Sequence, residues 1–240
     1  MAYQKYDKVL LIPMYNPPSG WEQTFLERYD AFCVQLGYTI PVVLSNDGST
    51  RDLKEETDFL QQQIGENFFC IHAEKNKGKG AALKSAASLL QADFYLFTDV
   101  DFPYSVESMV QVAGAVEKQG GIAMGVRQQT YYDDINAFRT YLSKILKWLN
   151  RLILQLPSND TQCGLKAFDA EAKACLLQSK TNRFLIDLEF LLAAQNQKIT
   201  IRPVEVRLRQ DIQFTNFNSM VLVKELLNFI QIVFRYRLLH

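Results

Sequence analysis

The sequence contains no uninterrupted apolar run of the roughly 18 to 20 residues that a membrane-spanning helix needs. The apolar part of its first stretch, MAYQKYDKVLLIPMY, is also too short for the core of a secretory signal peptide. We therefore expect a protein that is either soluble or peripheral to a membrane.

Cysteine and histidine are both scarce. Four cysteines are spread along the chain and no two of them form a CxxC pair, so neither a disulfide framework nor a zinc site is expected. The two histidines, His72 and His240, lie too far apart in the sequence to indicate a histidine metal site. We expect reduced, mostly buried thiols, which are typical of a cytoplasmic protein.

Several functional signals are also missing. Lysine plus arginine number 26, as do aspartate plus glutamate, so no net charge favours nucleic acid as a partner. The GxxxxGK[ST] spacing of a P-loop is absent, and so is the G-x-S-x-G turn of serine hydrolases. No cysteine and histidine are paired in a way that indicates a nucleophile.

Short apolar runs alternate with segments of helical period through the first half of the chain. The runs that predict strands are residues 8–12, 40–44, 68–72, 94–98 and 121–125, and the helical segments between them are 21–36, 52–64, 79–90 and 106–118. Strands separated by helices of this length form right-handed βαβ units on a parallel sheet. We therefore predict an α/β fold with a Rossmann-like, mainly parallel sheet flanked by helices and a C-terminal helical elaboration.

The second half of the chain is less regular. Helical periods at 137–156, 184–196 and 219–236 alternate with short strands at 164–168 and 199–206. The first and last of these helices combine broad apolar surfaces with cations, a composition that suits a membrane surface, packing on the sheet or a dimer interface. We predict one domain over residues 1–215 and a C-terminal amphipathic or interface helix over residues 216–240.

Three predicted strands end in stretches suited to binding a ligand: residues 13–16, 46–49 and 99–101. In α/β sheets of this kind, ligands collect at the carboxyl ends of the strands. Asp99 and Asp101 alternate along the chain, so an extended backbone would place both carboxylates on one side. Such a pair is unfavourable unless a cation or water separates the charges, which leaves open a Mg²⁺ or Mn²⁺ site and a solvated strand end.

Two turns between a strand and a helix carry further candidates. In the first, residues 45–52, Gly48 permits a sharp turn, Ser49 or Thr50 can cap the helix, and Asp47 is left facing the crevice. In the second, residues 76–82 (NKGKGAA), lysines and free backbone N–H groups at a helix N-terminus suit a phosphate. Locally, each could also be a plain capped turn. Their order with the DxD indicates a site for a nucleoside diphosphate and a metal.

The ordered set of motifs resembles the family 2 glycosyltransferases of GT-A fold. The matching stretches are I-P-M-Y-N at 12–16, N-D-G-S at 46–49, N-K-G-K-G at 76–80, D-V-D at 99–101 and G-V-R at 125–127. Downstream, D-T-Q-C-G-L-K at 160–166 and F-L-I-D-L-E at 184–189 are similar to the D-x-Q-C-G-F-K and F-x-x-D-x-E segments of the polyprenyl-phosphate branch. The resemblance spans roughly residues 8 to 210.

This resemblance implies an inverting, metal-dependent enzyme that moves a hexose from a UDP- or GDP-sugar to a dolichyl- or undecaprenyl-type phosphate. The enzyme would be cytoplasmic and peripheral at the inner face of the membrane, with Mg²⁺ or Mn²⁺ as cofactor. By position, the resemblance assigns donor binding to Pro13, Tyr15, Asn16, Asp47, Lys79 and Asp99, metal binding to Asp99 and Asp101, acceptor-phosphate binding to Arg127, Arg139 and Ser143, and catalysis to Asp101, Gln162, Asp187 and Glu189.

The sequence departs from the family pattern at three places. Asn46 stands where a first aspartate is common, and Pro17-Pro18 replaces an acidic pair. Phe102-Pro103 stands where the family frequently has Leu-Gln with a metal-binding glutamine, so no third protein ligand is assigned.

Two other functions remain open at this point. A transferase that acts on a hydroxyl of a glycan or lipid-linked saccharide would need a general base, for which Asp187 and Glu189 are the first candidates. A nucleotide-sugar-binding subunit without catalytic activity would also accommodate the departures. The apolar surface of the C-terminal helix also leaves a homo-oligomer interface open, and a separate membrane partner protein could supply anchoring to the membrane.

Overall fold

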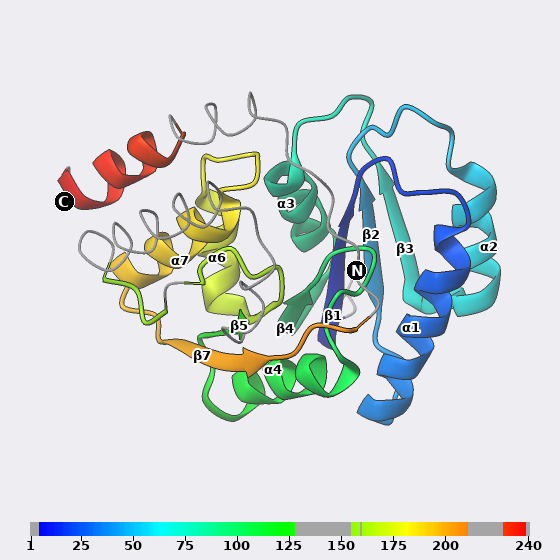
Figure 1. Cartoon of the computed structure of the whole chain (residues 1–240), viewed down its shortest axis with the longest axis horizontal. Helices are drawn as coiled ribbons and strands as arrows, with labels where there is room; N and C mark the ends of the chain where they lie inside the picture. Colours follow the sequence, from blue (N-terminus) through cyan, green and yellow to red (C-terminus); the bar gives the residue numbers. More distant parts are fainter. Residues whose placement is uncertain (1–4, 128–154, 159, 211–227, 239–240) are drawn as a thin grey trace.

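The computed structural model describes residues 5–127, 155–158, 160–210 and 228–238 of the chain, and its centre is a seven-stranded sheet (Figure 1). The strand order is β3-β2-β1-β4-β6-β5-β7. Strand β6 is antiparallel to both neighbours and the other pairings are parallel, which confirms a mainly parallel α/β sheet. The strands are β1 (Lys5–Met14), β2 (Val42–Asn46), β3 (Phe68–His72), β4 (Gln91–Phe97), β5 (Ile122–Arg127), β6 (Lys166–Asp169) and β7 (Ile201–Val206).

Helices cover both faces of the sheet. On one face lie α1 (Trp21–Leu36), α2 (Lys54–Ile64) and α4 (Val106–Gln119), which share one apolar cluster with the strands. On the other face, a second cluster joins the strands to α3 (Lys79–Leu89), α6 (Ala170–Gln178), α7 (Ile186–Asn196) and the C-terminal residues 228–238. The short 3-10 helix η1 (Gly65–Asn67) leads into β3.

Strand β1 shows why continuous apolar runs form the strands of this sheet. Leu10 and Ile12 face the cluster beneath α1, whereas Val9 and Leu11 face the cluster beneath α3. Because side chains alternate along a strand and both faces of this sheet are covered, all four positions are apolar and fully buried.

The predicted strands and helices that lie within the described residues are confirmed within a few residues of their expected ends, and one α-helix was omitted. Helix α6 was not predicted, although Asp169 provides the cap that starts it by accepting the Ala172 N–H at 2.8 Å. Its nine residues, AEAKACLLQ, follow β6 without a loop, so no break in the sequence marks the change from strand to helix.

Two predictions fall largely on residues that the structure does not describe. Of the predicted helix 137–156, only residues 155 and 156 are described, and they are not helical. Of the predicted helix 219–236, residues 228–233 are α-helical and continue into a π-helical segment, η4 (Phe234–Leu238). The domain boundary at residue 215 stays a prediction. Nowhere in the described ranges is there a helix of the length and apolarity that a bilayer crossing requires.

The aromatic centre of the second cluster provides a test of the fold. Phe168 is fully buried, and its ring lies 5.4 Å from Tyr95 and 5.1 Å from Phe190. Phe168→Ala should lower the free energy of unfolding by about 3 to 5 kcal/mol, measured by urea denaturation. The substitution leaves a cavity that the surrounding strands and helices cannot close. Val34→Ala, at an 82 % exposed position, is the control and should change it by less than about 0.5 kcal/mol. Equal losses in the two variants would contradict the placement of this cluster.

Candidate active site

The loops that follow β1 and β2 are joined by hydrogen bonds at the carboxyl edge of the sheet. The Asn16 N–H donates to Ser49 Oγ at 2.8 Å, and Asn16 Oδ1 accepts the Thr50 N–H at 2.8 Å. Asn46 Oδ1 accepts the Ser49 N–H at 3.0 Å. The expectation that Ser49 or Thr50 caps the next helix is wrong, because both residues bond to these asparagines and α2 begins only at Lys54.

Two of the donor candidates flank this junction without taking part in it. Pro13 is buried near the end of β1, where it lies beside Ser45 of β2. Tyr15 follows the strand and is 48 % exposed, so its ring is available to a ligand at the carboxyl edge.

Asp47 is only 4 % exposed, and its carboxylate holds the third strand-end loop. Its Oδ1 accepts the Lys77 N–H at 2.9 Å, and its Oδ2 accepts the Gly78 N–H at 2.6 Å and Asn76 Nδ2 at 2.9 Å. The expectation that this turn offers free backbone N–H groups is therefore wrong for Lys77 and Gly78. A carboxylate accepts such bonds strongly, and its two oxygens fix the loop against β2.

The glycines of this turn serve close packing against the loop that precedes α7. A Cβ on Gly78 would lie 2.4 Å from the Asn182 carbonyl oxygen, and one on Gly80 would lie 2.8 Å from that of Thr181. The Ala81 N–H donates to the same Asn182 oxygen at 3.1 Å. The carbonyl groups of Thr181 and Asn182 therefore pack against the first turn of α3, and one of them accepts the Ala81 N–H.

The DxD pair lies in a turn rather than on a strand. Strand β4 ends at Phe97, and the Phe102 N–H donates to the Asp99 carbonyl oxygen at 3.0 Å, which closes the turn. The expectation of alternating side chains on an extended backbone is therefore wrong. Surrounding protein atoms and the nearby Asp99 carboxylate nevertheless raise the pKa of Asp101, so the two charges do act on each other.

The position after the DxD belongs to the core. Phe102 has φ 43° and is 2 % exposed, and its ring packs edge-on against Phe25 of α1 at 5.2 Å. Arg28 and Arg209 donate to the Asp101 carbonyl oxygen at 2.5 and 3.2 Å, and these bonds hold the turn from two sides. Phe102 therefore anchors the turn and supplies no ligand.

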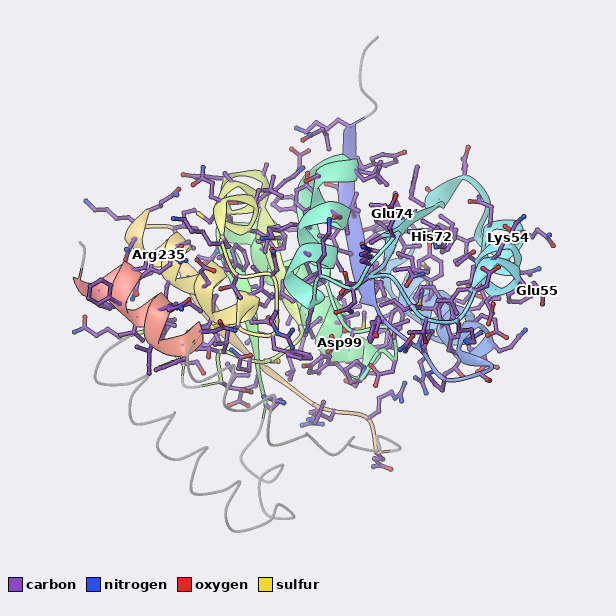
Figure 2. The ribbon with its side chains drawn as sticks, turned by 90° about the horizontal axis from the view of Figure 1, so that it is seen from above. Lys54, Glu55, His72, Glu74, Asp99 and Arg235 are labelled. Carbon is purple, nitrogen blue, oxygen red and sulfur yellow. The ribbon has the colours of Figure 1, made fainter. Side chains whose placement is uncertain are left out.

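A chain of alternating charges runs from this turn into the interior. Lys79 Nζ lies 2.8 Å from Asp99 Oδ1 and 3.7 Å from Asp187 Oδ2, and Asp187 Oδ1 accepts from Lys166 Nζ at 2.5 Å. Burial alone would lower the pKa of Lys79, but attraction to Asp99 and Asp187 raises it. Lys166 is fully buried and Asp187 is 3 % exposed. Asp99 lies near the middle of the molecule (Figure 2).

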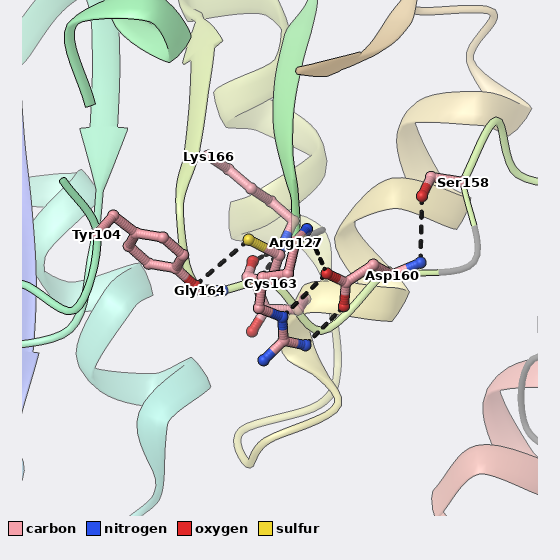
Figure 3. Close-up of polar contacts among 8 residues, drawn as sticks. Tyr104, Arg127, Ser158, Asp160, Cys163, Gly164 and Lys166 are labelled. Carbon is pink, nitrogen blue, oxygen red and sulfur yellow. Dashed lines mark hydrogen bonds and ion pairs between the residues drawn. The ribbon is translucent and has the colours of Figure 1, made fainter. Parts of the chain in front are cut away.

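The Q-C-G segment packs against this charge chain. The Gly164 N–H donates to the hydroxyl of the buried Tyr104 at 2.8 Å, and Cys163 Sγ lies 3.3 Å from the same oxygen (Figure 3). A Cβ on Gly164 would lie only 2.5 Å from Asp99 Oδ2 and 3.4 Å from Lys79 Nζ. Gln162, in contrast, is exposed. Any residue larger than glycine at position 164 would therefore displace the Asp99 carboxylate.

Arg127 and Asp160 form a partly buried pair at the end of β5. Asp160 Oδ2 accepts from both the Arg127 backbone N–H and Nε at 2.9 Å, and Asp160 Oδ1 accepts from Nη2 at 2.6 Å (Figure 3). Burial alone would raise the pKa of Asp160, but the Arg127 guanidinium lowers it. The other two acceptor-phosphate candidates, Arg139 and Ser143, lie outside the described residues.

Glu189 lies away from the charge chain and binds the C-terminal segment. It is fully buried, its Oε1 accepts from Arg235 Nη1 at 2.6 Å, and its Oε2 accepts the Thr181 N–H at 2.6 Å. The Lys180 N–H and Tyr236 hydroxyl also donate to Oε1, at 3.2 and 3.3 Å. Arg235 lies on the C-terminal helix, far from Asp99 (Figure 2).

The carboxylates of Asp99 and Asp101 fit a divalent cation by donor chemistry. Mg²⁺ commonly takes one or two carboxylates and fills the rest of its coordination with phosphate oxygens and water. Asp101 is exposed and Asp99 is partly so, and their mutual repulsion favours a cation between them. Across the described ranges there is no cluster of three His, Cys, Asp or Glu side chains, so any third ligand among these residues would be of another type.

Three residues of the site were not assigned roles from the sequence: Tyr104, Asp160 and Lys166. Lys166 could have been recognised from the sequence, since a lysine between apolar neighbours on a predicted strand is expected to be buried and then needs an anion as partner. Asp160 and Tyr104 gave no comparable signal, because their partners Arg127 and Gly164 are 33 and 60 residues away in the sequence.

The close approach of Gly78 to the loop before α7 gives a prediction about stability. Gly78→Ala should lower the free energy of unfolding by about 1 to 3 kcal/mol in urea denaturation, because the added methyl overlaps the backbone carbonyl oxygen of Asn182 and because Gly78 has φ 108°. Gly114→Ala is the matched control, since a Cβ at Gly114 in α4 meets no atom within 4 Å. That variant should be neutral or more stable by up to about 1 kcal/mol. A neutral Gly78→Ala variant would contradict the described packing.

Glu189 gives a prediction about pH. Burial alone would raise its pKa, but hydrogen bonds from Thr181 and Lys180 and the charge of Arg235 lower it. Because the folded-state pKa lies below the usual 4.5, the stabilisation from ionised Glu189 is complete above that pH and is lost as the pH falls through the folded-state value. Glu189→Gln should cost about 2 kcal/mol at pH 7, less than for a fully buried pair because Arg235 is partly exposed.

The measurement for Glu189 is thermal unfolding of wild type and Glu189→Gln between pH 7 and pH 3. The difference in melting temperature should shrink as the pH falls below about 4.5, because the carboxylate of the unfolded chain takes up a proton there while the folded one stays ionised to a lower pH. A difference that stays constant over this range would show that the ionised carboxylate contributes nothing.

This chain is similar to one family model and to several named proteins. The family model described as glycosyl transferase family 2 matches residues 9–176. Dolichyl-phosphate beta-glucosyltransferase from Dictyostelium discoideum is 26% identical over 211 residues, which cover 82% of this chain and 64% of that protein. Undecaprenyl-phosphate 4-deoxy-4-formamido-L-arabinose transferase from Pseudomonas syringae pv. syringae (strain B728a) is 27% identical over 162 residues, which cover 66% of this chain and 46% of that protein. The chain thus spans between about half and two thirds of these relatives.

Solved structures show the same fold. Mannosyl-3-phosphoglycerate synthase from Rubrobacter xylanophilus has a TM-score of 0.67 at 14% identity, over 96% of this chain and 73% of that one. Glucosyl-3-phosphoglycerate synthase from Mycobacterium tuberculosis, solved with Mn²⁺, UDP and phosphoglyceric acid, has a TM-score of 0.61 at 15% identity, over 96% and 78%. Such identities show the fold alone, and they confirm the GT-A class. Since the family model covers most of the chain and the strand-end loops from β1 to the Q-C-G segment, this chain belongs to glycosyl transferase family 2, as its ordered motifs predicted.

Proposed function

We propose that this chain transfers a hexose from a nucleotide-sugar donor to a polyprenyl phosphate, with inversion at the anomeric carbon. The named relatives, which act on dolichyl and undecaprenyl phosphates, support this acceptor class. The donor would be a UDP- or GDP-sugar bound at the carboxyl edge by Pro13, Tyr15 and Asn16, with Asp47 holding the adjoining loop. The chain would work at the inner face of the membrane as a peripheral protein.

The observation that carries the choice of acceptor is the pairing of the two base candidates. Asp187 faces Lys166 with one oxygen and Lys79 with the other, and Glu189 is enclosed by four donors. Every oxygen of these two carboxylates is thus already occupied by a cation or a hydrogen-bond donor of the protein. A sugar hydroxyl would need a base to take its proton, whereas a phosphate is already ionised at pH 7. The pairing therefore favours a phosphate acceptor over a hydroxyl.

At the donor end, the chain contributes charge and position. Asp99 and Asp101 would hold Mg²⁺ or Mn²⁺, which when bound supplies positive charge to the leaving diphosphate. Lys79 adds an ammonium group to the same region. Gln162, the first residue of the Q-C-G segment, is exposed, and we assign it to contact with the sugar. A single in-line displacement then depends on holding the anomeric carbon between donor and acceptor.

At the acceptor end, Arg127 is the candidate ligand for the lipid phosphate, with Arg139 and Ser143 as further candidates. Asp160 fixes the Arg127 guanidinium by a bidentate pair, so its orientation does not have to be established when the acceptor binds. Arg127→Lys would keep the positive charge and lose this planar geometry. It therefore tests the geometry of the guanidinium separately from its charge, which Arg127→Ala does not.

The test is transfer of radiolabelled sugar from UDP-glucose, GDP-mannose and UDP-N-acetylglucosamine to undecaprenyl and dolichyl phosphate with Mn²⁺ or Mg²⁺. Product should form with at least one donor, and Asp101→Asn should reduce its rate roughly 100-fold, the effect of about 2.7 kcal/mol of lost transition-state stabilisation. Asp93→Asn is the control, because Asp93 pairs with Lys5 at the opposite end of β4 and should keep full activity.

Two results would contradict the proposal. Transfer to a saccharide hydroxyl but not to either lipid phosphate would assign a different acceptor. A donor affinity that does not change on addition of Mn²⁺ or Mg²⁺, together with no transfer from any donor, would identify a non-catalytic nucleotide-sugar-binding subunit.

A further inference from the structure

Lys79 is placed between two carboxylates that differ in their surroundings. It is the first residue of α3, its side chain is 17 % exposed, and its ammonium nitrogen lies 2.8 Å from Asp99 and 3.7 Å from Asp187. A shift of about 1 Å toward Asp187 would bring the ammonium nitrogen as close to Asp187 as it is to Asp99. A lysine side chain has the freedom to make such a movement, because its four-carbon stem is flexible.

The farther carboxylate is immobilised and cannot follow Lys79. Asp187 is 3 % exposed, and its other oxygen accepts from the fully buried Lys166 at 2.5 Å. Lys166 also donates to the Cys163 carbonyl oxygen at 2.5 Å, so it is held from two sides. The Asp187 oxygen that faces Lys79 is therefore a fixed anion close to the donor site.

The nearer carboxylate is accessible to other cations. The Asp99 side chain is 40 % exposed, and it lies in the turn that also carries Asp101. The Gly164 backbone closes one side of the Asp99 and Lys79 pair, so a cation has to reach Asp99 from the exposed side. The ammonium group of Lys79 thus occupies one of the two carboxylates that a divalent ion would use.

We propose that Lys79 is an internal counter-cation that pairs with Asp99 until a divalent ion binds there, and that Asp187 then receives its ammonium group. This inference rests on the proposed function, since it takes the DxD as the metal site. It assigns Asp187 a positioning role, as the second partner of Lys79, in place of the role of a base.

Charge balance explains what the exchange would achieve. Three carboxylates and two ammonium groups leave one net negative charge among Lys79, Asp99, Asp101, Lys166 and Asp187. A divalent ion alone must displace Lys79 from Asp99 and leaves the group net positive. A nucleoside diphosphate compensates that charge, so the metal and the diphosphate should each strengthen the binding of the other.

The experiment is a Mn²⁺ titration of the full chain, with unbound Mn²⁺ measured by electron paramagnetic resonance, first without and then with UDP. Lys79→Met removes the competing charge while keeping the length of the side chain, so Mn²⁺ alone should bind roughly tenfold more tightly than to wild type. Lys84→Met is the matched control on the same helix, because Lys84 bonds to the 179–182 loop and should leave Mn²⁺ affinity unchanged. UDP should strengthen Mn²⁺ binding more in wild type than in Lys79→Met.

A second variant should change the Mn²⁺ affinity in the opposite direction. The double variant Lys166→Met with Asp187→Asn removes both members of the buried pair, which avoids leaving one charge unpaired. Lys79 then has only Asp99 as a partner, so Mn²⁺ alone should bind more weakly than to wild type. Opposite effects in these two variants would not arise from a general loss of stability.

The outcomes separate this inference from the proposed function. Equal or weaker Mn²⁺ binding by Lys79→Met, with binding still abolished by Asp101→Asn, would overturn the exchange and leave the metal site standing. Mn²⁺ binding that is absent, or that is unaffected by Asp101→Asn, would overturn both the exchange and the proposed metal site.

Discussion

The buried charge of Lys166 is the constraint on which the carboxyl edge of the sheet depends. An ammonium group with no exposed surface is costly unless an anion neutralises it, and Asp187 of α7 provides that anion for Lys166. The remaining oxygen of Asp187 faces Lys79 of α3, and Lys79 faces Asp99 in the turn after β4. One buried cation therefore orders polar groups from four parts of the chain.

The strand-end loops are held in place by hydrogen bonds between protein groups. Asp47 holds the turn before α3 through two backbone N–H groups, Asn16 joins the first two loops, and Asp160 orients Arg127. Several side chains that look like ligands in the sequence thus bind one another. This arrangement suits a transferase, because catalysis by electrostatic stabilisation depends on groups that need no rearrangement during the reaction.

Much of the fold could be predicted from the sequence, since the apolar runs of β1 to β5 and the helices between them follow their periods closely. Helix α6 was missed because no break separates it from β6, and the turn after β4 was taken for extended strand. The order of the motifs predicted the family. The partners of Asp47, Asp160 and Glu189 could not be predicted, because tertiary packing decides which backbone and side-chain donors reach a buried carboxylate.

The exchange of Lys79 between Asp99 and Asp187 is tested most directly by the position of Lys79 with metal and diphosphate bound. A crystal structure of the chain with Mn²⁺ and UDP should show Mn²⁺ on Asp99 and Asp101, with Lys79 Nζ within about 3 Å of Asp187, a normal charge-assisted hydrogen-bond distance. A structure in which Lys79 remains on Asp99 while Mn²⁺ binds the diphosphate elsewhere would contradict it.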